Sequence, residues 1–281
     1  MVREFYMENE TGQRFSMMDI EKGCFLSSPN VLGYSYDIEY EQIGDNFIQN
    51  IRKLTQGQIS GELIFKKYDN YKLFVDFIEG AVSLKIVYKV PFNEGYIEYF
   101  KDIDISTVEK GEIGTDGVLR VPVTFNCKSL WYEAKEVVYT IDSISNEVRW
   151  DFTWDSIFTA YDNRNIIFKN KGHAEAPFKL ELNGEVISPI ITILEDDIEV
   201  NKLSLDGLVV LDGETFVYNT KETEQEITKV SKTGRTNLFS FLNPNFINFF
   251  KLRKGASTIR LEADGEITSG KITIYVQYKA V

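Results

Sequence analysis

Hydrophobic and polar residues alternate with a period of two along most of the chain. Segments 82–90, 119–127 and 272–278 place hydrophobic side chains at every second position. This spacing predicts strands with one buried face. Pro122 interrupts the second segment, and because proline cannot donate a ladder hydrogen bond, it predicts an edge strand or a bulge.

A turn signal follows a fourth alternating segment. Phe178, Leu180 and Leu182 are hydrophobic, and Asn183-Gly184 comes directly after them. This dipeptide is the strongest short-range signal for a β-hairpin. We therefore expect strand 178–182 to turn back on itself and pair with the strand that follows.

Helical periodicity is confined to short stretches. Hydrophobic residues from Tyr71 to Ile78 fall at i, i+3, i+4 and i+7, after the cap candidates Asp69-Asn70 and before Gly80. This pattern predicts one short amphipathic helix that covers a sheet. A second helical turn is expected within Asn243–Leu252.

The strand pattern lapses between Tyr139 and Asn165, where Trp150 and Trp154 stand in an aromatic stretch. We expect two β-rich domains in series, with residues 1–145 in the first and 146–281 in the second. The first domain contains the clear helix.

Composition and charge narrow the functional classes. The chain has 281 residues, is 43% hydrophobic and carries a formal net charge of −12. This charge argues against a nucleic-acid binder and against adhesion to anionic membranes. The N-terminus lacks the apolar stretch of a signal peptide, and no run approaches the about 20 apolar residues of a membrane span. A soluble protein made in the cytosol is expected.

The inventory of reactive residues is small. The chain has a single histidine, which excludes a zinc site built on several histidines and leaves one candidate base for a Ser–His–Asp triad. Cys24 and Cys127 form no C-x-x-C pair, and two buried free thiols are expected rather than one bridge. The chain has no phosphate-binding glycine motif and no H-E-x-x-H or G-x-S-x-G sequence. The glycines between Gly111 and Gly117 flank acidic residues, which indicates a polar hairpin loop.

Carboxylates are the only abundant groups that could carry acid–base chemistry. Residues 195–199 hold four of them, and Glu195 with Asp197 could serve a glycosidase, which needs two carboxylates across a sugar. A solvated hairpin tip is the favoured interpretation. Asp102 and Asp104 could place two carboxylates on one strand face for Ca²⁺, but solvent-facing strand residues are favoured.

Structural roles are favoured for three further candidate binding or catalytic sites. His173 lies in a loop context and is expected at the surface. Trp131-Tyr132 and the pair Trp150 and Trp154 could stack on sugars, but filling cores or interdomain seams is favoured. We predict no enzyme, and no catalytic, cofactor-binding or metal-binding residue.

The order and spacing of motifs over nearly the whole chain resemble the distal tail proteins of siphophages. The residues that carry this resemblance in the first half are Gly61–Phe65, the helix with Tyr71, Phe74 and Phe77, Leu84–Tyr88, Lys101–Asp104, Val121–Cys127 and Ser129–Tyr132. Those in the second half are Ile167–Gly172, Ala176-Pro177, Leu182–Pro189, Leu211–Glu214, Phe249–Gly255 and Ile272–Tyr278.

This resemblance implies a mainly β fold and a structural role in a phage or prophage tail. The first domain would be a split β-barrel with one short helix, and six copies would close into a ring. The second would be a galectin-like β-sandwich projecting outward. The ring would join the tail tube protein to the tail-tip protein, and DNA would pass through its lumen without specific binding. The location implied is the virion, after synthesis in the cytoplasm of a bacterial host.

The charge of the first domain agrees with a ring through which DNA passes. Residues 1–145 carry 15 basic and 23 acidic groups, and this acidic excess would make the lumen repel DNA.

One alternative function stays open. It is a carbohydrate-binding module that adsorbs to a host-surface glycan through the second domain. Because His173 is isolated and Trp150 and Trp154 stand at the start of that domain, we expect no millimolar binding to common cell-wall sugars.

Overall fold

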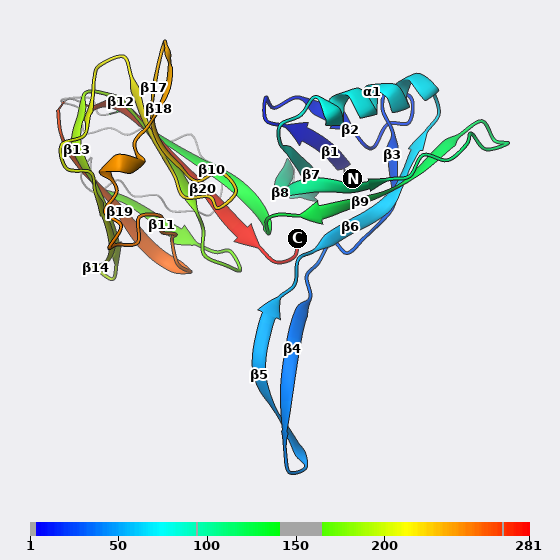
Figure 1. Cartoon of the computed structure of the whole chain (residues 1–281), viewed down its shortest axis with the longest axis horizontal. Coiled ribbons are helices and arrows are strands. Elements are labelled where there is room, and N and C mark those ends of the chain that lie inside the picture. The colour runs from blue at the N-terminus through cyan, green and yellow to red at the C-terminus, as the bar shows by residue number, and fades with distance from the viewer. Residues whose placement is uncertain (1–3, 94, 141–164, 266) are drawn as a thin grey trace. The chain divides into compact units, whose positions relative to one another are not determined.

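The computed structural model describes residues 4–93, 95–140, 165–265 and 267–281, shown in Figure 1. The chain is mainly β and divides into two compact units, the first formed by Met1–Glu133 with Tyr278–Val281 and the second by Ala134–Gln277. The domain boundary predicted at residue 145 lies outside the described residues.

The elements of the first unit are β1 (Glu4–Asn9), β2 (Arg14–Ser16), β3 (Phe25–Asn30), β4 (Tyr36–Ile43), β5 (Asn46–Leu54), β6 (Gln58–Phe65), α1 (Tyr68–Glu79), β7 (Leu84–Phe92), β8 (Gly95–Val108) and β9 (Leu119–Cys127). Strand β10 (Trp131–Thr140) begins in this unit and continues into the second.

The elements of the second unit are β11 (Asn165–Asn170), β12 (Phe178–Gly184), β13 (Val186–Glu195), β14 (Ile198–Ser204), β15 (Val209–Val210), β16 (Thr215–Asn219), β17 (Glu226–Ser231), β18 (Gly234–Asn237), the 3-10 helix η1 (Phe239–Phe241), β19 (Gly255–Asp264) and β20 (Ile267–Tyr278).

Seven strands form the antiparallel sheet of the first unit, in the order β2-β1-β7-β8-β9-β6-β3. Alternation along β9 is as predicted, since its odd-numbered residues from Leu119 to Cys127 are buried. These side chains join a core that includes Phe65, Phe74 and Trp131. The alternation in the sequence therefore identifies the face of β9 that packs inward.

The predicted helix is confirmed as α1, which lies over the core of this unit (Figure 1). Phe74 is fully buried and its ring packs 5.5 Å from Phe15 and 5.7 Å from Phe65, measured between ring centroids. The helix starts one turn earlier than expected, with Lys67 at the N-cap and Gly80 at the C-cap. The predicted cap residue Asn70 is instead buried.

Asn70 fastens the helix to a neighbouring loop. Its side-chain amide donates to the carbonyl oxygens of Glu21 and Gly23, at 3.2 and 3.1 Å. A side chain used in this way cannot also cap the helix. The sequence alone did not distinguish the two roles, since both use the same amide group.

Of the two alternatives predicted from Pro122, an edge strand or a bulge, the edge strand is wrong. Strand β9 pairs with β6 on one side and β8 on the other. The carbonyl oxygen of Pro122 accepts from the backbone N–H of Glu109, just past the end of β8. The missing N–H of Pro122 therefore faces the point where β8 has ended, and the β8–β9 register shifts nearby, between Ile105 and Thr107.

Two antiparallel sheets build the second unit. One follows the order β18-β17-β16-β12-β20-β10, and the other the order β11-β19-β13-β14, with β15 also paired to β13. The predicted strand at residues 272–278 is confirmed within β20. Its buried hydrophobic residues, Ile272, Ile274 and Val276, keep the predicted period of two.

The hairpin predicted at Asn183-Gly184 is wrong. Strand β12 pairs with β16 and β20, whereas β13 belongs to the other sheet. Gly184 has φ of +100°, and the β12–β20 register shifts between Asn183 and Gly184. The dipeptide therefore forms a corner between two sheets, where the glycine supplies the positive φ that the bend requires.

The helical turn predicted within Asn243–Leu252 is also wrong. The only helical residues nearby are the three of η1, while residues 243–252 form turns and irregular structure. Asn243 accepts from the backbone N–H of Asn245, and Asn248 donates to the carbonyl oxygens of Asn243 and Phe246. These local bonds compete with a helical ladder, and Pro244 lacks an N–H to donate to one.

Tyr278 returns the chain to the first unit. Its ring packs edge-on against Tyr99 at 5.5 Å, and its hydroxyl donates to Glu133 at 3.3 Å. The second unit is therefore inserted in sequence between residues 133 and 278 of the first. Among the described residues, no helix is long and apolar enough to cross a membrane.

Candidate interaction surfaces

The acidic cluster at residues 195–199 forms a turn at the surface. Asp196 and Asp197 join β13 to β14 and have φ of +49° and +64°. Both are exposed, as expected for a solvated hairpin tip. Glu195 accepts from Arg253 at 3.2 Å, a bond that partly neutralises the cluster. The predicted hairpin tip is confirmed.

Asp102 and Asp104 have different environments. Asp102 is buried and accepts from the Tyr132 hydroxyl at 2.9 Å. Asp104 is exposed and pairs with Lys128 at 3.2 Å. The expectation that both face solvent is therefore right only for Asp104. In the part of the chain that the structure describes, no three His, Cys, Asp or Glu residues gather to hold a metal ion.

The remaining candidates hold structural positions. His173 is exposed in a loop, as predicted. Trp131 is fully buried, and its indole N–H donates to the carbonyl oxygen of Leu32 at 2.8 Å. Cys24 and Cys127 are buried free thiols, also as predicted. Trp150 and Trp154 lie outside the described residues.

A buried lysine supports Trp131. The ammonium nitrogen of Lys101 lies 4.9 Å from the centre of the Trp131 ring, and the Lys101 side chain is buried. Burial lowers the pKa of Lys101, while its interaction with Cys127 opposes this shift. Burial likewise raises the pKa of the Cys127 thiol. Because these groups lie inside the core, they stabilise the fold and are not accessible to a substrate.

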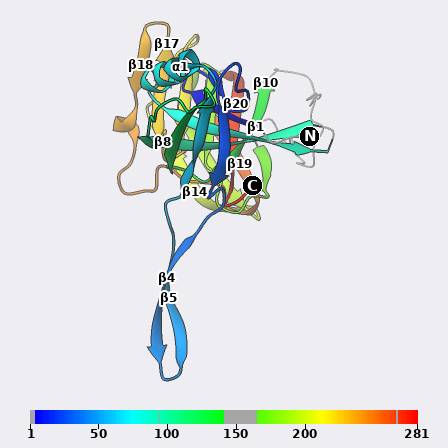
Figure 2. The same ribbon diagram turned by 90° about the vertical axis from the view of Figure 1, so that its right-hand side faces the viewer.

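The most exposed apolar surface of the first unit is the hairpin β4–β5. It extends away from the body of that unit in both views (Figures 1 and 2). All nine residues of β5 are exposed. The large apolar side chains that face solvent on the hairpin are Tyr40, Ile43, Phe47, Ile48, Ile51 and Leu54. An isolated two-stranded hairpin is marginally stable in water, so this surface is suited to a protein partner.

The base of the hairpin is fastened to the first unit. Ser35 and Thr55 face each other there, and the Thr55 backbone N–H donates to the Ser35 carbonyl at 3.1 Å. The Arg52 guanidinium lies 3.9 Å from the centre of the Tyr36 ring, and the Tyr36 hydroxyl accepts from Lys279. The first two contacts join the arms of the hairpin, and Lys279 joins its base to the rest of the unit, whereas no hydrogen bond or ion pair among the described residues links the tip to a residue outside the hairpin.

This hairpin was not among the predicted elements, although its sequence carries a turn signal. Gly44 and Asp45 form a two-residue loop, because Ile43 pairs with Asn46. Gly44 has φ of +64°, which fits the first central position of a type II′ turn. The flanking alternation is irregular, because the register shifts between Glu39 and Tyr40. Only Tyr36 and Ile38 alternate before that shift.

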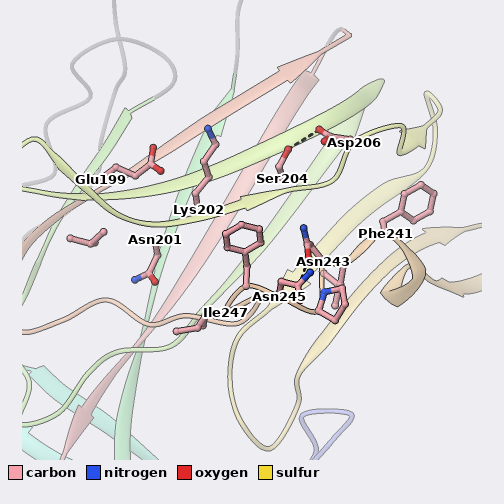
Figure 3. Close-up of a pocket in the computed structure, with 13 residues that line it drawn as sticks. Glu199, Asn201, Lys202, Ser204, Asp206, Phe241, Asn243, Asn245 and Ile247 are labelled. Carbon is pink, nitrogen blue, oxygen red and sulfur yellow. Dashed lines mark hydrogen bonds between the residues drawn. The ribbon is translucent and has the colours of Figure 1, made fainter.

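A second candidate surface is an open groove in the second unit, with a volume of about 920 Å³. One wall is β14 and the other is the segment 241–247, which runs beside it (Figure 3). Phe246 and Ile247 are exposed on the second wall. The groove thus combines apolar side chains with the polar and charged side chains of β14.

Comparisons with known proteins converge on phage tails. The family model for the N-terminal domain of the distal tail protein matches residues 4–128. No curated protein matches the chain. A chain of the phage P2 baseplate in its activated conformation with Ca aligns over 100% of both chains, with a TM-score of 0.72 and 17% identity. The same baseplate with Sr gives a TM-score of 0.72 and 16% identity, also over 100% of both chains.

A third solved structure is the SPP1 Dit (gp 19.1) protein, described as a paradigm of the hub adsorption apparatus in phages that infect Gram-positive hosts. It aligns over 96% of this chain and 98% of its own, with a TM-score of 0.54 and 12% identity. At these identities the likeness is one of fold.

Proposed function

Because the chain belongs to the distal tail protein family through residues 4–128, we propose that it is the hub of a phage or prophage tail. The resemblance seen in the sequence is thereby confirmed. In this proposal the protein is a non-enzymatic component of the virion, made in the cytoplasm of a bacterial host. The relatives of similar fold, a baseplate chain and a hub protein, support this role.

The proposed assembly is a homo-hexameric ring formed by the first unit, which would be a split β-barrel. The observation that carries this proposal is the hairpin β4–β5, whose apolar side chains face solvent in the single chain. A hairpin that leaves the body of one copy and packs on the next makes a heterologous contact. Repetition of such a contact closes a ring when the rotation allows it.

The second unit, a galectin-like β-sandwich in this proposal, would project outward from the ring. The tail tube protein would bind one face of the ring and the tail-tip protein the other. The acidic excess of residues 1–145 supports a lumen that DNA crosses without being bound. Glycan binding by the second unit stays a prediction from the sequence, to be tested by titration with a glycan panel.

The test is the absolute mass of the purified full chain by light scattering across a concentration series, followed by electron microscopy. We expect a species of six times 32.4 kDa and a ring with a central opening. A protein that stays monomeric at every concentration, alone and when mixed with its tail tube and tail-tip proteins, would contradict the ring.

A further inference from the structure

Strand β14 is an edge strand of its sheet. It pairs with β13, and no described strand pairs with its other side. The direction of its free backbone groups follows from one hydrogen bond, in which the N–H of Leu205 donates to the carbonyl oxygen of Pro189. In an antiparallel ladder the bonded positions alternate. The N–H and carbonyl groups of Lys202 and Ser204 therefore point away from β13.

The side chains of β14 divide into two rows. Leu203 and Leu205 are buried, whereas Lys202 is exposed and Ser204 is half-buried on the opposite face. The groove runs along this strand (Figure 3), and Phe246 and Ile247 belong to its second wall. A strand added to β14 would therefore point its side chains alternately to the face of Leu203 and Leu205 and to the face of Lys202 and Ser204.

The charged side chains that line the groove restrict the sequence of a strand that could bind there. Lys202 makes no ion pair with any described residue, and Asp206, in the turn that follows β14, accepts from the Ser204 hydroxyl at 2.8 Å. Both charged side chains line the groove. A complementary strand would carry an acidic residue near Lys202 and a basic residue near Asp206.

We propose that β14 and the segment 241–247 form a docking groove for an extended polypeptide segment of another protein. The segment adds as a strand to the free edge of β14, which is the mode of β-augmentation. The backbone groups of Lys202 and Ser204 recognise its main chain. Apolar residues at alternate positions of the segment pack on Phe246 and Ile247, while its charged residues meet Lys202 and Asp206.

This inference does not depend on the ring. The groove lies in the second unit, whereas the ring is assigned to the hairpin of the first. Loss of the hexamer through a hairpin variant would leave the groove unchanged. Failure of either proposal is therefore distinguishable from failure of the other.

The test uses two synthetic peptides of the length of β14, seven residues, with acetylated and amidated ends. One has the sequence Val-Glu-Val-Thr-Val-Lys-Val, and the other exchanges its glutamate and lysine. Binding to the full chain is measured by calorimetry, and amide hydrogen exchange is followed by mass spectrometry with residue-level fragmentation. We expect one of the two peptides to bind more tightly than the other and to slow exchange at the Lys202 and Ser204 amides.

Three variants make the test specific. Ser204→Pro removes an outward N–H while leaving the ladder to β13 intact, so peptide binding should be lost. Lys202→Glu should weaken the preferred peptide about two- to fivefold and favour the exchanged one, the range expected for a partly exposed charge pair. Lys169→Glu, on the opposite edge strand β11, is the matched control and should change neither affinity.

Several outcomes would overturn the proposal. These are the absence of binding by either peptide at millimolar concentration, Lys202 and Ser204 amides already protected in the free protein, and equal affinities for wild type and Lys202→Glu. Protection that rises with protein concentration alone would make a second copy the occupant. Protection by chitooligosaccharides in place of peptides would make the groove a glycan site.

Discussion

Phe47 lies near the tip of the hairpin β4–β5, and replacing it with alanine is expected to weaken the proposed ring. The residue is 67% exposed in the single chain. Since a phenylalanine can bury about 200 Å², about 130 Å² is available for a neighbouring copy. At about 25 cal/mol per Å², this area corresponds to at most about 3 kcal/mol per interface. The dissociation constant of each interface should then rise by up to about 150-fold.

The assay is light scattering of wild type and Phe47→Ala over the same concentration series. The variant should dissociate at a higher protein concentration than wild type. Its monomer should unfold in urea with a free energy within about 0.5 kcal/mol of wild type, because the side chain is exposed. Leu211→Ala is the matched control, since Leu211 is 55% exposed but lies in the second unit.

Two results would refute this reasoning. The first is a mass profile of Phe47→Ala that superimposes on the wild-type profile. The second is an equal loss of assembly in Leu211→Ala, which would show that any loss of exposed apolar surface has the same effect. Either result would remove the hairpin as the proposed ring interface, although the match of residues 4–128 to the distal tail protein family model would stand.

Three further predictions concern the first unit. Phe74→Ala should lower the free energy of unfolding by about 3–5 kcal/mol in a urea titration, and a loss below about 1 kcal/mol would contradict its place in the core. The Arg14 guanidinium lowers the pKa of Glu98, so the pair stabilises the fold above the unfolded pKa of about 4.3 and loses this effect as pH falls through the lower folded pKa. Glu98→Gln should accordingly lower the free energy of unfolding by up to about 1 kcal/mol at pH 7, the most that a partly exposed ion pair contributes, and should leave it unchanged near pH 2. An equal loss of stability at the two pH values would contradict this role of the Arg14–Glu98 pair. Burial raises the pKa of the Cys24 and Cys127 thiols, so a maleimide should label neither in the native protein and both in urea, whereas rapid native labelling would be incompatible with their burial.

Local patterns predicted four of the strands and the helix because each depends on a single repeating property. The inward residues of β9 and the face of α1 both follow from which side chains must avoid water. The same reasoning located the exposed turn at Asp196-Asp197, since consecutive charges resist burial. These features need no knowledge of which strand lies beside which.

Features that depend on pairing could not be predicted in the same way. Asn183-Gly184 supplies a tight bend whether the next strand pairs back or crosses to another sheet, so its sequence does not choose between them. Pro122 is tolerated between two neighbours because β8 has ended beside it, a fact of length and register. The groove beside β14 likewise arises from segments about 40 residues apart in sequence.

The return of Tyr278 to the first unit has a consequence for synthesis. Tyr278 emerges from the ribosome only after the whole second unit, which takes on the order of 10 s at typical elongation rates. Until then the Tyr99 ring lacks its partner and the Glu133 carboxylate lacks one of its donors. A chain that terminates before Tyr278 therefore carries a first unit without this closing contact, even when the whole second unit has been made.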